Sequence, residues 1–528
     1  MTESDFDVVI AGGGHNALAC AALLVKHGVK VLVVERNEFV VGGVVTREVT
    51  LPGFRHDLYG SSHVWIHINP SFRDELQPEL EKHGLKYIWS DDLITGHPNL
   101  DGQGIIVYKD VDKTCDTIAE YSRKDATRYR EIYEEFAEIE AGVVKGMFSP
   151  PSPPSYMYHA LEQNPEGLRR LRDYQLSSRS FTFKNFENPH VRAFILGWAT
   201  APQTLPDQEA TAQGFYVMIP SIHYYGQAVP EGGSGMLSVS MQRYIEANGG
   251  QVMTNATVDK FIVKNGECKG LELADGTEIS ASRAVVTALD PQQTFLRCMD
   301  ESDVDKRILD IVRNFSFGNV TIVRAHYALN EAPVFSNGPD MTATPFQRIV
   351  GTVADLDRQY QEIAAGIAPS DPFLWSACWT KMDPTRAPDD KHTLIFDTFV
   401  STELVNGDDW EEIGPDYVRN VLLRNLRRHT TNMTDDNILG EFIDTGPNLA
   451  RSNWSFVNGT TTGGERLLSQ IGCFRPIPGF AEYRSPIVNL YMTGPSCHPG
   501  GGICAMGTNT ANTMLEDFGI RESEAETY

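Results

Sequence analysis

The sequence has few cysteines, and none of them stands in a pattern that binds a metal or builds a disulfide framework. The eight cysteines of this 528-residue chain are scattered, and no two form a CxxC pair. Zinc fingers and small disulfide scaffolds are excluded, because both need closely spaced cysteines. We therefore predict free thiols, a reducing compartment and a cytoplasmic location.

Long apolar runs and an N-terminal targeting signal are also missing. No stretch supplies the roughly 18 to 20 uncharged apolar residues that a membrane-spanning helix needs. The first strand is predicted to begin within about six residues of Met1, which leaves no room for a secretory signal peptide. These absences exclude a membrane-spanning protein and leave peripheral membrane contact open.

Basic residues are too few for a protein that binds nucleic acid. The chain has 45 Lys and Arg against 70 Asp and Glu, which gives a formal net charge of -25. Such a charge repels phosphate backbones at long range, so no nucleic-acid partner is predicted. The remaining composition, with 41% hydrophobic residues, is that of an ordinary globular protein with two or three domains.

The N-terminus reads as strand, glycine turn, helix and strand. Residues 7–11 form a short apolar run, residues 16–26 carry apolar side chains at helical spacing, and residues 29–34 form a second apolar run. This order predicts one βαβ unit with a parallel sheet.

The glycine turn has the pattern of a dinucleotide-binding motif. Gly12, Gly14 and Ala17 give a G-x-G-x-x-A between the strand and the helix, and the second strand ends in Glu35. The glycines allow a pyrophosphate to approach the backbone N–H groups of a helix N-terminus, and the carboxylate can accept hydrogen bonds from a ribose. Glu35 favours an unphosphorylated ribose, as in FAD or NAD.

Further along the chain, helices and then a meander are predicted. Residues 110–215 read mainly as helix, and the proline-rich run 149–154 marks a loop. The dipeptides Asn265-Gly266 and Asp275-Gly276 predict hairpins ahead of an apolar strand at 284–288.

Two further glycine-rich segments carry a family resemblance. The segment Gly42-Gly43-Val44-Val45-Thr46 resembles the diglycine motif of FAD-dependent oxidoreductases of the amine-oxidase type, and residues 53–62 continue that likeness. With the C-terminal segment 491–503, the chain resembles the phytoene desaturase family. The branch it resembles contains pyridine nucleotide-disulphide oxidoreductase domain-containing protein 2.

The resemblance implies an α/β fold with a Rossmann-type FAD-binding domain of the amine-oxidase and phytoene-desaturase type, together with a mixed α+β substrate domain. The FAD domain is predicted at 1–70, 225–295 and 445–528, and the substrate domain at 71–224 and 296–444. The residues expected to bind FAD are Gly12, Gly14, His15, Asn16, Ala17, Glu35, Arg36, Gly42, Gly43, Val44, Val45, Thr46, Gly60, Ser61, Val258, Gly494, Gly501, Gly502 and Ile503.

Catalytic and metal-binding candidates are few. His498 lies beside the C-terminal glycines and is a candidate base, positioning group or loop anchor. His63 and His67 stand four residues apart, but no acidic residue completes an HExxH motif. We predict no metal site and keep His63 as a second catalytic candidate with a pocket or packing role as its alternative.

The predicted function is FAD-dependent desaturation of a C–C bond in a largely apolar small molecule. Dioxygen or a quinone is expected to accept the electrons, because only one strand-GxGxxG-helix unit is found. Two alternatives stay open at this point. One is an amine oxidase on the same scaffold, and the other is a non-enzymatic protein like the GDP-dissociation inhibitors that bind prenylated GTPases.

Overall fold

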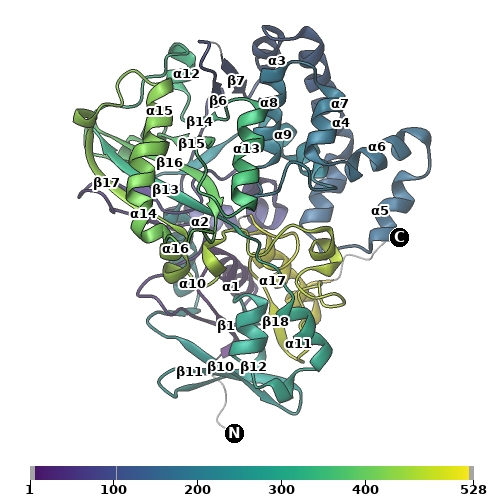
Figure 1. Ribbon diagram of the computed structural model, residues 1–528. Helices are drawn as coiled ribbons and strands as arrows, with labels where there is room; N and C mark the ends of the chain where they lie inside the picture. The colour runs from purple at the N-terminus through teal and green to yellow at the C-terminus, as the bar shows by residue number, and fades with distance from the viewer. Residues whose placement is uncertain (1–5, 103, 503, 523–528) are drawn as a thin grey trace.

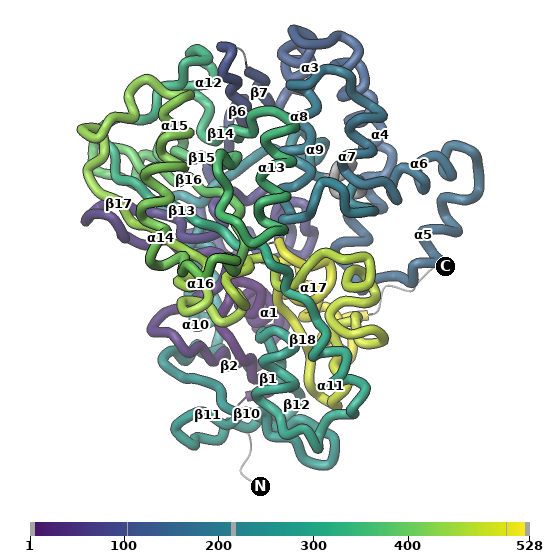
Figure 2. The backbone as a smooth tube through the Cα atoms, in the orientation of Figure 1, coloured from purple at the N-terminus to yellow at the C-terminus, as the bar shows by residue number. Residues whose placement is uncertain are grey.

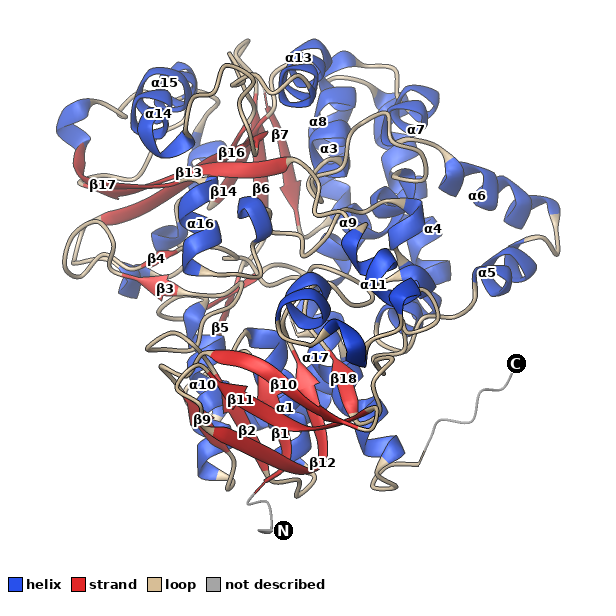
Figure 3. Cartoon of the chain, turned by 60° about the horizontal axis from the view of Figure 1, so that its bottom comes forward, coloured by secondary structure: helices blue, strands red, loops and turns tan. Residues whose placement is uncertain are grey.

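Two seven-stranded sheets form the framework of the protein (Figure 1, Figure 3). The computed structural model describes residues 6–102, 104–502 and 504–522. In Figure 1 the first sheet lies in the lower part of the molecule, the second lies at the upper left, and a group of helices fills the upper right.

The first sheet combines a parallel core with an antiparallel meander. Its strand order is β10-β11-β12-β1-β2-β9, and β18 pairs with β12 on a separate path. β9, β2, β1, β12 and β18 run parallel, so their carboxyl ends meet at one edge. The bounds are β1 (Phe6–Ala11), β2 (Val31–Val34), β9 (Gln251–Met253), β10 (Val258–Lys264), β11 (Glu267–Leu273), β12 (Glu278–Thr287) and β18 (Leu490–Met492).

Burial explains why the N-terminal unit is apolar on every side. Residues 31–34 of β2 are all buried, and so is every residue of α1 (His15–Lys26) up to Val25. α1 packs between α10 (Gly235–Ala247) and α17 (Ala505–Asp517), so this helix has no solvent face and needs no polar stripe. The predicted βαβ unit with a parallel sheet is confirmed.

The meander differs from the prediction in one respect. The turn at Asp275-Gly276 leads into β12, which continues without a break as far as Thr287. The first half of β12 pairs with β11, and its second half enters the parallel core beside β1. One long strand therefore joins the meander to the nucleotide-binding sheet. The sheet draws its strands from three separate parts of the sequence, and the predicted domain boundaries stay a prediction.

The second sheet contains both parallel and antiparallel strand pairs, and it lies above the first sheet in Figure 1. Its strand order is β17-β13-β16-β15-β14-β6-β7. The bounds are β6 (Leu93–Pro98), β7 (Gly104–Tyr108), β13 (Val320–Leu329), β14 (Phe346–Ile349), β15 (Leu374–Ala377), β16 (His392–Ser401) and β17 (Ile438–Asp444). Short paired strands join the regions, namely β3 (Thr46–Arg47) with β4 (His56–Asp57) and β5 (Tyr87–Trp89) with β8 (Ala228–Pro230).

Successive side chains of a strand point to opposite faces of the sheet. One face of the second sheet therefore packs in a core, and the other faces a cavity. Val323, Ala325 and Tyr327 of β13, with Leu394 and Phe396 of β16, form a core with the helices beside them. The covering helices are α14 (Trp410–Tyr417) and α15 (Arg424–His429), while α13 (Val353–Ala364) packs against Ile322 and Phe399 on the other face. The alternate residues of the same strands face a cavity, which is described below.

Helices dominate residues 111–225, as the sequence predicts. They are α3 (Val111–Ala119), α4 (Arg123–Met147), α5 (Pro154–Leu161), α6 (Pro165–Gln175), α7 (Ser178–Asn185), α8 (Pro189–Ala199) and α9 (Ala212–Tyr225). α5 and α6 project from the rest of the chain in both ribbon and tube views (Figure 1, Figure 2). The proline-rich loop ends where α5 begins at Pro154, a position that tolerates proline because its N–H would have no helical acceptor.

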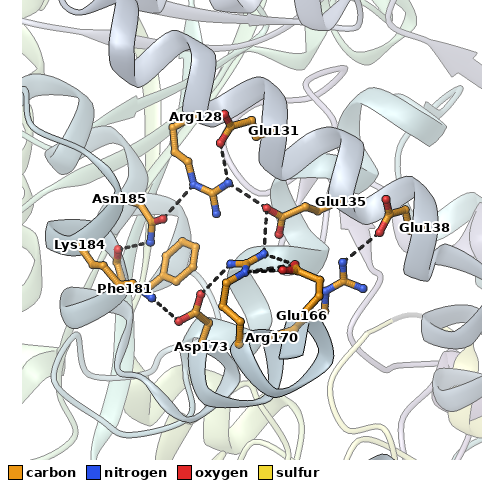
Figure 4. A network of polar contacts seen from close by, with 11 residues as sticks. Arg128, Glu131, Glu135, Glu138, Glu166, Arg170, Asp173, Phe181, Lys184 and Asn185 are labelled. Atoms are coloured by element: carbon orange, nitrogen blue, oxygen red, sulfur yellow. Dashed lines mark hydrogen bonds and ion pairs between the residues drawn. The ribbon is translucent and has the colours of Figure 1, made fainter. Parts of the chain in front are cut away.

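An ion-pair network fastens α6 to its neighbours (Figure 4). Asp173 of α6 is buried and accepts hydrogen bonds from Lys184 of α7 and from Arg169. Arg128 of α4 donates to Glu131 and Glu135, each at 2.9 Å. The buried carboxylate is thus matched by two cations, which its burial requires.

The remaining helices are short or surround the sheets. They are α2 (Gln77–Glu81), α11 (Lys306–Arg313), α12 (Pro339–Ala343) and α16 (Gly446–Ser452). In the part of the chain that the structure describes, no helix is both long and apolar enough to cross a membrane.

Candidate active site

One cavity of about 2600 Å³ extends from the glycine loops of the first sheet to the inner face of the second. A pocket for a single small ligand typically measures about 300 to 1000 Å³. The volume is therefore large enough for an extended dinucleotide and a second molecule. The cavity has two ends of different chemistry, a glycine-rich end and an aromatic end.

The glycine-rich end begins with the turn between β1 and α1. Gly12 has φ +98°, and a Cβ at Gly13 would lie 2.8 Å from the Cβ of Glu35. The first helical hydrogen bond runs from the N–H of Leu18 to the carbonyl of Gly14, and Gly14 has no capping side chain. Among the described residues, the backbone N–H groups of 15–17 have no acceptor. They form a helix N-terminus suited to a pyrophosphate.

Glu35 lies at the carboxyl end of β2 and lines the cavity. One carboxylate oxygen accepts from the N–H of Gly13 at 2.8 Å, and the other accepts from the backbone and side chain of Asn37 at 2.9 and 2.7 Å. The oxygen bonded to Gly13 can accept a second hydrogen bond, so the carboxylate is held in place and still able to receive a ribose hydroxyl.

Arg36 is occupied by the protein itself. Its guanidinium stacks at 4.2 Å on the ring of Trp454, and its Nη2 donates to the carbonyls of Arg451 and Ser452. Arg297 stacks on the same ring, also at 4.2 Å. Trp454 and Arg297 line the cavity beside Val258. No local motif connects either residue to the βαβ unit, so the amino-acid sequence does not indicate their place here.

The diglycine lies directly against the first glycine turn. A Cβ at Gly42 would stand 2.8 Å from both the Cα of Gly14 and the backbone nitrogen of His15. Gly43 donates its N–H to Nδ1 of His15 at 3.0 Å, and Nε2 of His15 lies 3.5 Å from the carbonyl of Gly502. Since Nδ1 accepts, the proton of the neutral ring lies on Nε2 and faces that carbonyl. His15 therefore connects all three glycine segments.

The residues after the diglycine lie behind the cavity wall. Val44 and Val45 are buried in the core, and Thr46 donates from Oγ1 to Asp57 at 2.6 Å. None of these three is a lining residue, whereas Gly60 and Ser61 are. The chain turns inward after Gly43 because its apolar side chains are buried against neighbouring elements.

The C-terminal glycines complete this end of the cavity. Gly494, Gly501 and Gly502 have φ +97°, +64° and +72° and line the wall before α17. A Cβ at Gly502 would meet nothing within 4 Å, so the backbone there faces open space. The predicted contact at Ile503 lies outside the described residues.

Two arginines stand behind these glycines. Arg466 donates from Nη2 to the carbonyl of Gly500 at 3.0 Å, and Arg475 donates to the carbonyl of Pro495 at 2.8 Å. Burial lowers the pKa of both guanidinium groups, that of Arg475 to about 9. Neither has a carboxylate within 4 Å in the described part of the chain. They leave a positive potential at this wall, which favours a ligand that gains negative charge.

The two candidate catalytic histidines have different positions. His498 lines the cavity and donates from Nε2 to the carbonyl of Gly146 at 2.8 Å, while its buried Nδ1 has no partner. This bond fastens the end of α4 to the glycine loop. His63 is fully buried, contacts the hydroxyl of Tyr87 at 3.0 Å and is not a lining residue. Only His498 can therefore touch a bound molecule.

Five histidines share a pKa of about 4, lowered chiefly by burial, against an ordinary value of 6.5. They are His15, His56, His67, His223 and His429. In the described residues, no group of three or more His, Cys, Asp or Glu side chains is arranged to hold a metal ion.

These pKa values predict a loss of stability in mild acid. Below pH 6.5 these histidines become protonated in the unfolded chain but stay neutral in the folded protein. The free energy of unfolding therefore falls as the pH drops from 6.5 towards 4. At pH 5.5 each histidine costs on the order of 1 kcal/mol. Asp444, whose pKa burial raises to about 6, offsets a fraction of this. Unfolding midpoints at pH 7.5 and 5.5 measure the effect, and equal midpoints would contradict the assignment.

The aromatic end of the cavity is formed by the inner face of the second sheet. The lining residues there include Trp198, Ile322, Phe346, Trp375, Trp379, Ile395 and Phe399. Arg324, Arg348 and Asp397 lie among them. This end can take an apolar molecule and contains few polar groups to direct it.

Comparisons with known proteins agree with a nucleotide-binding role for the glycine-rich end. A model of the NAD(P)-binding Rossmann-like domain family matches residues 10–77. A limonene dehydrogenase subunit from Castellaniella defragrans is 27% identical and covers 97% of this chain and 95% of its own. Pyridine nucleotide-disulfide oxidoreductase domain-containing protein 2 of Mus musculus is 25% identical over 98% of this chain and 94% of its own. The lycopene-forming phytoene desaturase of Pseudescherichia vulneris is 27% identical over 58% of this chain and 60% of its own.

The chain is similar to phytoene desaturase-like oxidoreductases. Its fold is also that of putrescine oxidase, which in the solved structure of a triple mutant has a TM-score of 0.60 and 15% identity. That alignment covers 97% of this chain and 98% of the oxidase. At this identity the likeness shows the fold alone. The predicted resemblance and the predicted α/β, Rossmann-type fold class are confirmed, and a flavin is the cofactor type that these relationships indicate.

Proposed function

We propose that this oxidoreductase uses FAD to dehydrogenate a C–C bond of a largely apolar small molecule. The observation that carries the proposal is the single cavity, which joins a dinucleotide cradle to a wall of aromatic and aliphatic side chains. A reaction between a bound dinucleotide and an apolar molecule needs such a junction, because both reactants must meet in a space that excludes water.

The cradle fits FAD in three respects. The N–H groups of 15–17 would receive the pyrophosphate, Glu35 would receive the ribose, and the backbone at Gly501 and Gly502 would lie against the flavin ring. When bound, FAD supplies a hydride acceptor at N5. Arg466 and Arg475 would stabilise the charge that reduction adds, because neither has a carboxylate to neutralise it.

The aromatic end supports an apolar substrate. Trp198, Trp375, Trp379 and Phe399 offer surfaces for dispersion and apolar burial. The names of two relatives, the limonene dehydrogenase and the phytoene desaturase, refer to apolar hydrocarbons. The chain's part in the reaction is to hold a C–H bond close to the flavin and to keep water away.

Two other functions compete with this one. In amine oxidation a cavity carboxylate could receive the ammonium group, but Asp397 is already bonded to Arg324. A GDP-dissociation inhibitor-like protein from Plasmodium falciparum shares the fold with a TM-score of 0.51, which places no function on this chain. Retention of Glu35 and of all three glycine segments favours a cofactor-dependent enzyme.

The proposal is tested by identifying the cofactor and then the product. Denatured protein should release FAD, identified by chromatography and mass, and not FMN. Anaerobic mixing with a panel of terpenes and other apolar molecules should bleach the flavin absorbance only with true substrates. The product should lack two hydrogens and contain a new C=C bond. An imine product would support amine oxidation, and a colourless protein that FAD cannot reconstitute would overturn the proposal.

NADPH and NADH are expected not to reduce the flavin at catalytic rates. The parallel core of the first sheet provides one glycine-turn cradle, and FAD would fill it. Electrons would then leave to dioxygen or a quinone. Stopped-flow mixing with each nicotinamide under anaerobic conditions measures the rate, with reduction by dithionite as the positive control. Rapid bleaching by either nicotinamide would contradict this expectation.

His498→Ala is expected to keep FAD and measurable reduction by the substrate. His498 binds the carbonyl of Gly146, and positioning contributes roughly 7 to 11 kcal/mol to such reactions, whereas a general base contributes about 10²- to 10⁴-fold. Gly502→Leu should remove activity, because its side chain would enter the open space before the glycine backbone. Flavin content and the reduction rate distinguish the two variants. Complete inactivity of His498→Ala with flavin in place would make His498 the essential base.

A further inference from the structure

A row of polar and charged residues crosses the inner face of the second sheet. Strand register pairs Arg348 of β14 with Trp375 of β15, Trp375 with Asp397 of β16, and Asp397 with Arg324 of β13. All four line the cavity. Because paired residues on neighbouring strands share a face, the row runs across the sheet from the aromatic end.

Arg348 is held in an aromatic cage at one end of this row. Its guanidinium carbon lies 3.5 Å from the ring centre of Trp198, 4.7 Å from that of Trp375 and 5.5 Å from that of Phe346. The residue is only 4% exposed. Burial lowers its pKa to about 9, so the group remains charged at neutral pH.

One edge of this guanidinium is occupied and the other is free. Nη1 donates to the carbonyl of Gly197 at 3.0 Å. Nε is buried without a partner, and among the described residues Nη2 has no acceptor either. Nε and Nη2 lie side by side on the planar fork, which is the edge that binds both oxygens of a carboxylate. The stacked rings cover the faces of the fork, and the buried Nε on that edge has no partner among the described residues.

No carboxylate of the described residues forms an ion pair with Arg348, and the charge of Asp397 acts on it only from beyond ion-pair distance. Asp397 is the carboxylate across Trp375, but it is bonded to Nε of Arg324 at 2.7 Å. Within the described ranges, no carboxylate lies within 4 Å of Arg348. His97 on the neighbouring strand β6 accepts from Trp198 at 3.1 Å, and burial lowers its pKa well below the ordinary value, so it is neutral. A buried cation without an anion is costly unless a ligand completes it.

We propose that Arg348 anchors a carboxylate group of the substrate through Nε and Nη2. The substrate is then an apolar acid whose hydrocarbon part lies along the aromatic wall, with its carboxylate at β14. β14 belongs to the aromatic end of the cavity, whereas the C-terminal glycines belong to its glycine-rich end. This inference rests on the proposed function for its place in the reaction, while the carboxylate site itself rests on the geometry of Arg348.

The test compares binding of a matched pair of probes to the purified protein. Dodecanoic acid and its methyl ester have the same chain, and only the acid carries a charge. Isothermal titration at pH 7.5 should give roughly 10- to 100-fold tighter binding of the acid, because bonds between charged groups are the strong ones. Arg348→Gln should abolish this preference, and Arg348→Lys should restore part of it, since lysine keeps the charge without the fork. Arg358→Gln is the matched control, because Arg358 is an exposed arginine paired with Asp355.

The outcomes separate the anchor from the reaction. Equal affinity of the wild-type protein for acid and ester would overturn the anchor, whatever chemistry the enzyme performs. An Arg348-dependent preference for the acid without any dehydrogenation would support the anchor and count against the proposed function. If circular dichroism shows that Arg348→Gln does not fold, the test rests on Arg348→Lys. A folded Arg348→Lys variant that binds the ester as the wild type does and keeps the full preference for the acid would contradict binding through Nε and Nη2.

Discussion

Gly42→Ala is expected to lose most of its FAD while remaining folded. The added Cβ would stand 2.8 Å from the Cα of Gly14 and from the backbone nitrogen of His15, and backbone atoms cannot move aside as a flexible side chain can. The two glycine segments must separate, which displaces the helix N-terminus from the pyrophosphate. Such overpacking costs about 1 to 3 kcal/mol, which corresponds to roughly 5- to 150-fold weaker binding.

The loss of FAD is expected to depend on where the added methyl group lies, because alanine at some other glycine positions has room. At Gly14 a Cβ would meet the carbonyl of Val41 at 3.4 Å, so alanine fits there and only a larger side chain should block the cofactor. Gly142→Ala on α4 is the matched control, since its Cβ would meet nothing within 4 Å. Reconstitution of flavin-free protein with FAD, followed by fluorescence quenching, gives the affinities. Equal affinities for Gly42→Ala and Gly142→Ala would contradict the predicted contact between the loops.

Arg386→Leu is expected to produce the largest loss of stability in this protein. Arg386 is 1% exposed and lies between two fully buried carboxylates, Asp57 at 2.5 Å and Asp383 at 2.9 Å. It also donates to the carbonyl of Pro230 at 3.1 Å. Removing the cation leaves two buried anions without a counter-charge, and breaking a buried pair in this way costs about 3 to 5 kcal/mol.

An exposed arginine of similar connectivity provides the control. Arg313 also bridges two carboxylates, Glu301 at 2.6 Å and Asp310 at 3.1 Å, but its side chain is 45% exposed. Because exposed ion pairs contribute about 0 to 1 kcal/mol, Arg313→Leu should barely move the unfolding midpoint. Urea unfolding followed by circular dichroism compares the two variants. A similar small shift in both would show that the buried network contributes no more than a surface pair.

The cofactor cradle could be predicted from the sequence because its parts are close along the chain. Gly12, Gly14 and Glu35 stand within one βαβ unit, where alternating burial and glycine conformation are local properties. The motif also puts Val44, Val45 and Thr46 beside the cofactor, whereas these three residues do not line the cavity, and their contacts with FAD stay a prediction. Motif membership does not say which residues of a loop face inward, because burial of valine depends on what packs against it.

His15 shows how far such local reasoning extends. Its place at the start of α1 follows from the glycine pattern, but its bond to Gly43 and its approach to Gly502 depend on segments from distant parts of the chain. The stacking of Arg36 and Arg297 on Trp454 is of the same kind. No spacing in the sequence indicates these contacts.

The sequence by itself determined the fold class, the nucleotide cradle and the family resemblance, since these rest on glycines, apolar runs and turn dipeptides that act over short distances. Only the tertiary structure decided the substrate end of the cavity. Alternation predicts that Arg348 and Asp397 each occupy one face of a strand, but it cannot say which strands are neighbours or in which register they pair. The order and register of the strands depend on how the whole sheet packs. This packing places Arg348 in the cavity wall.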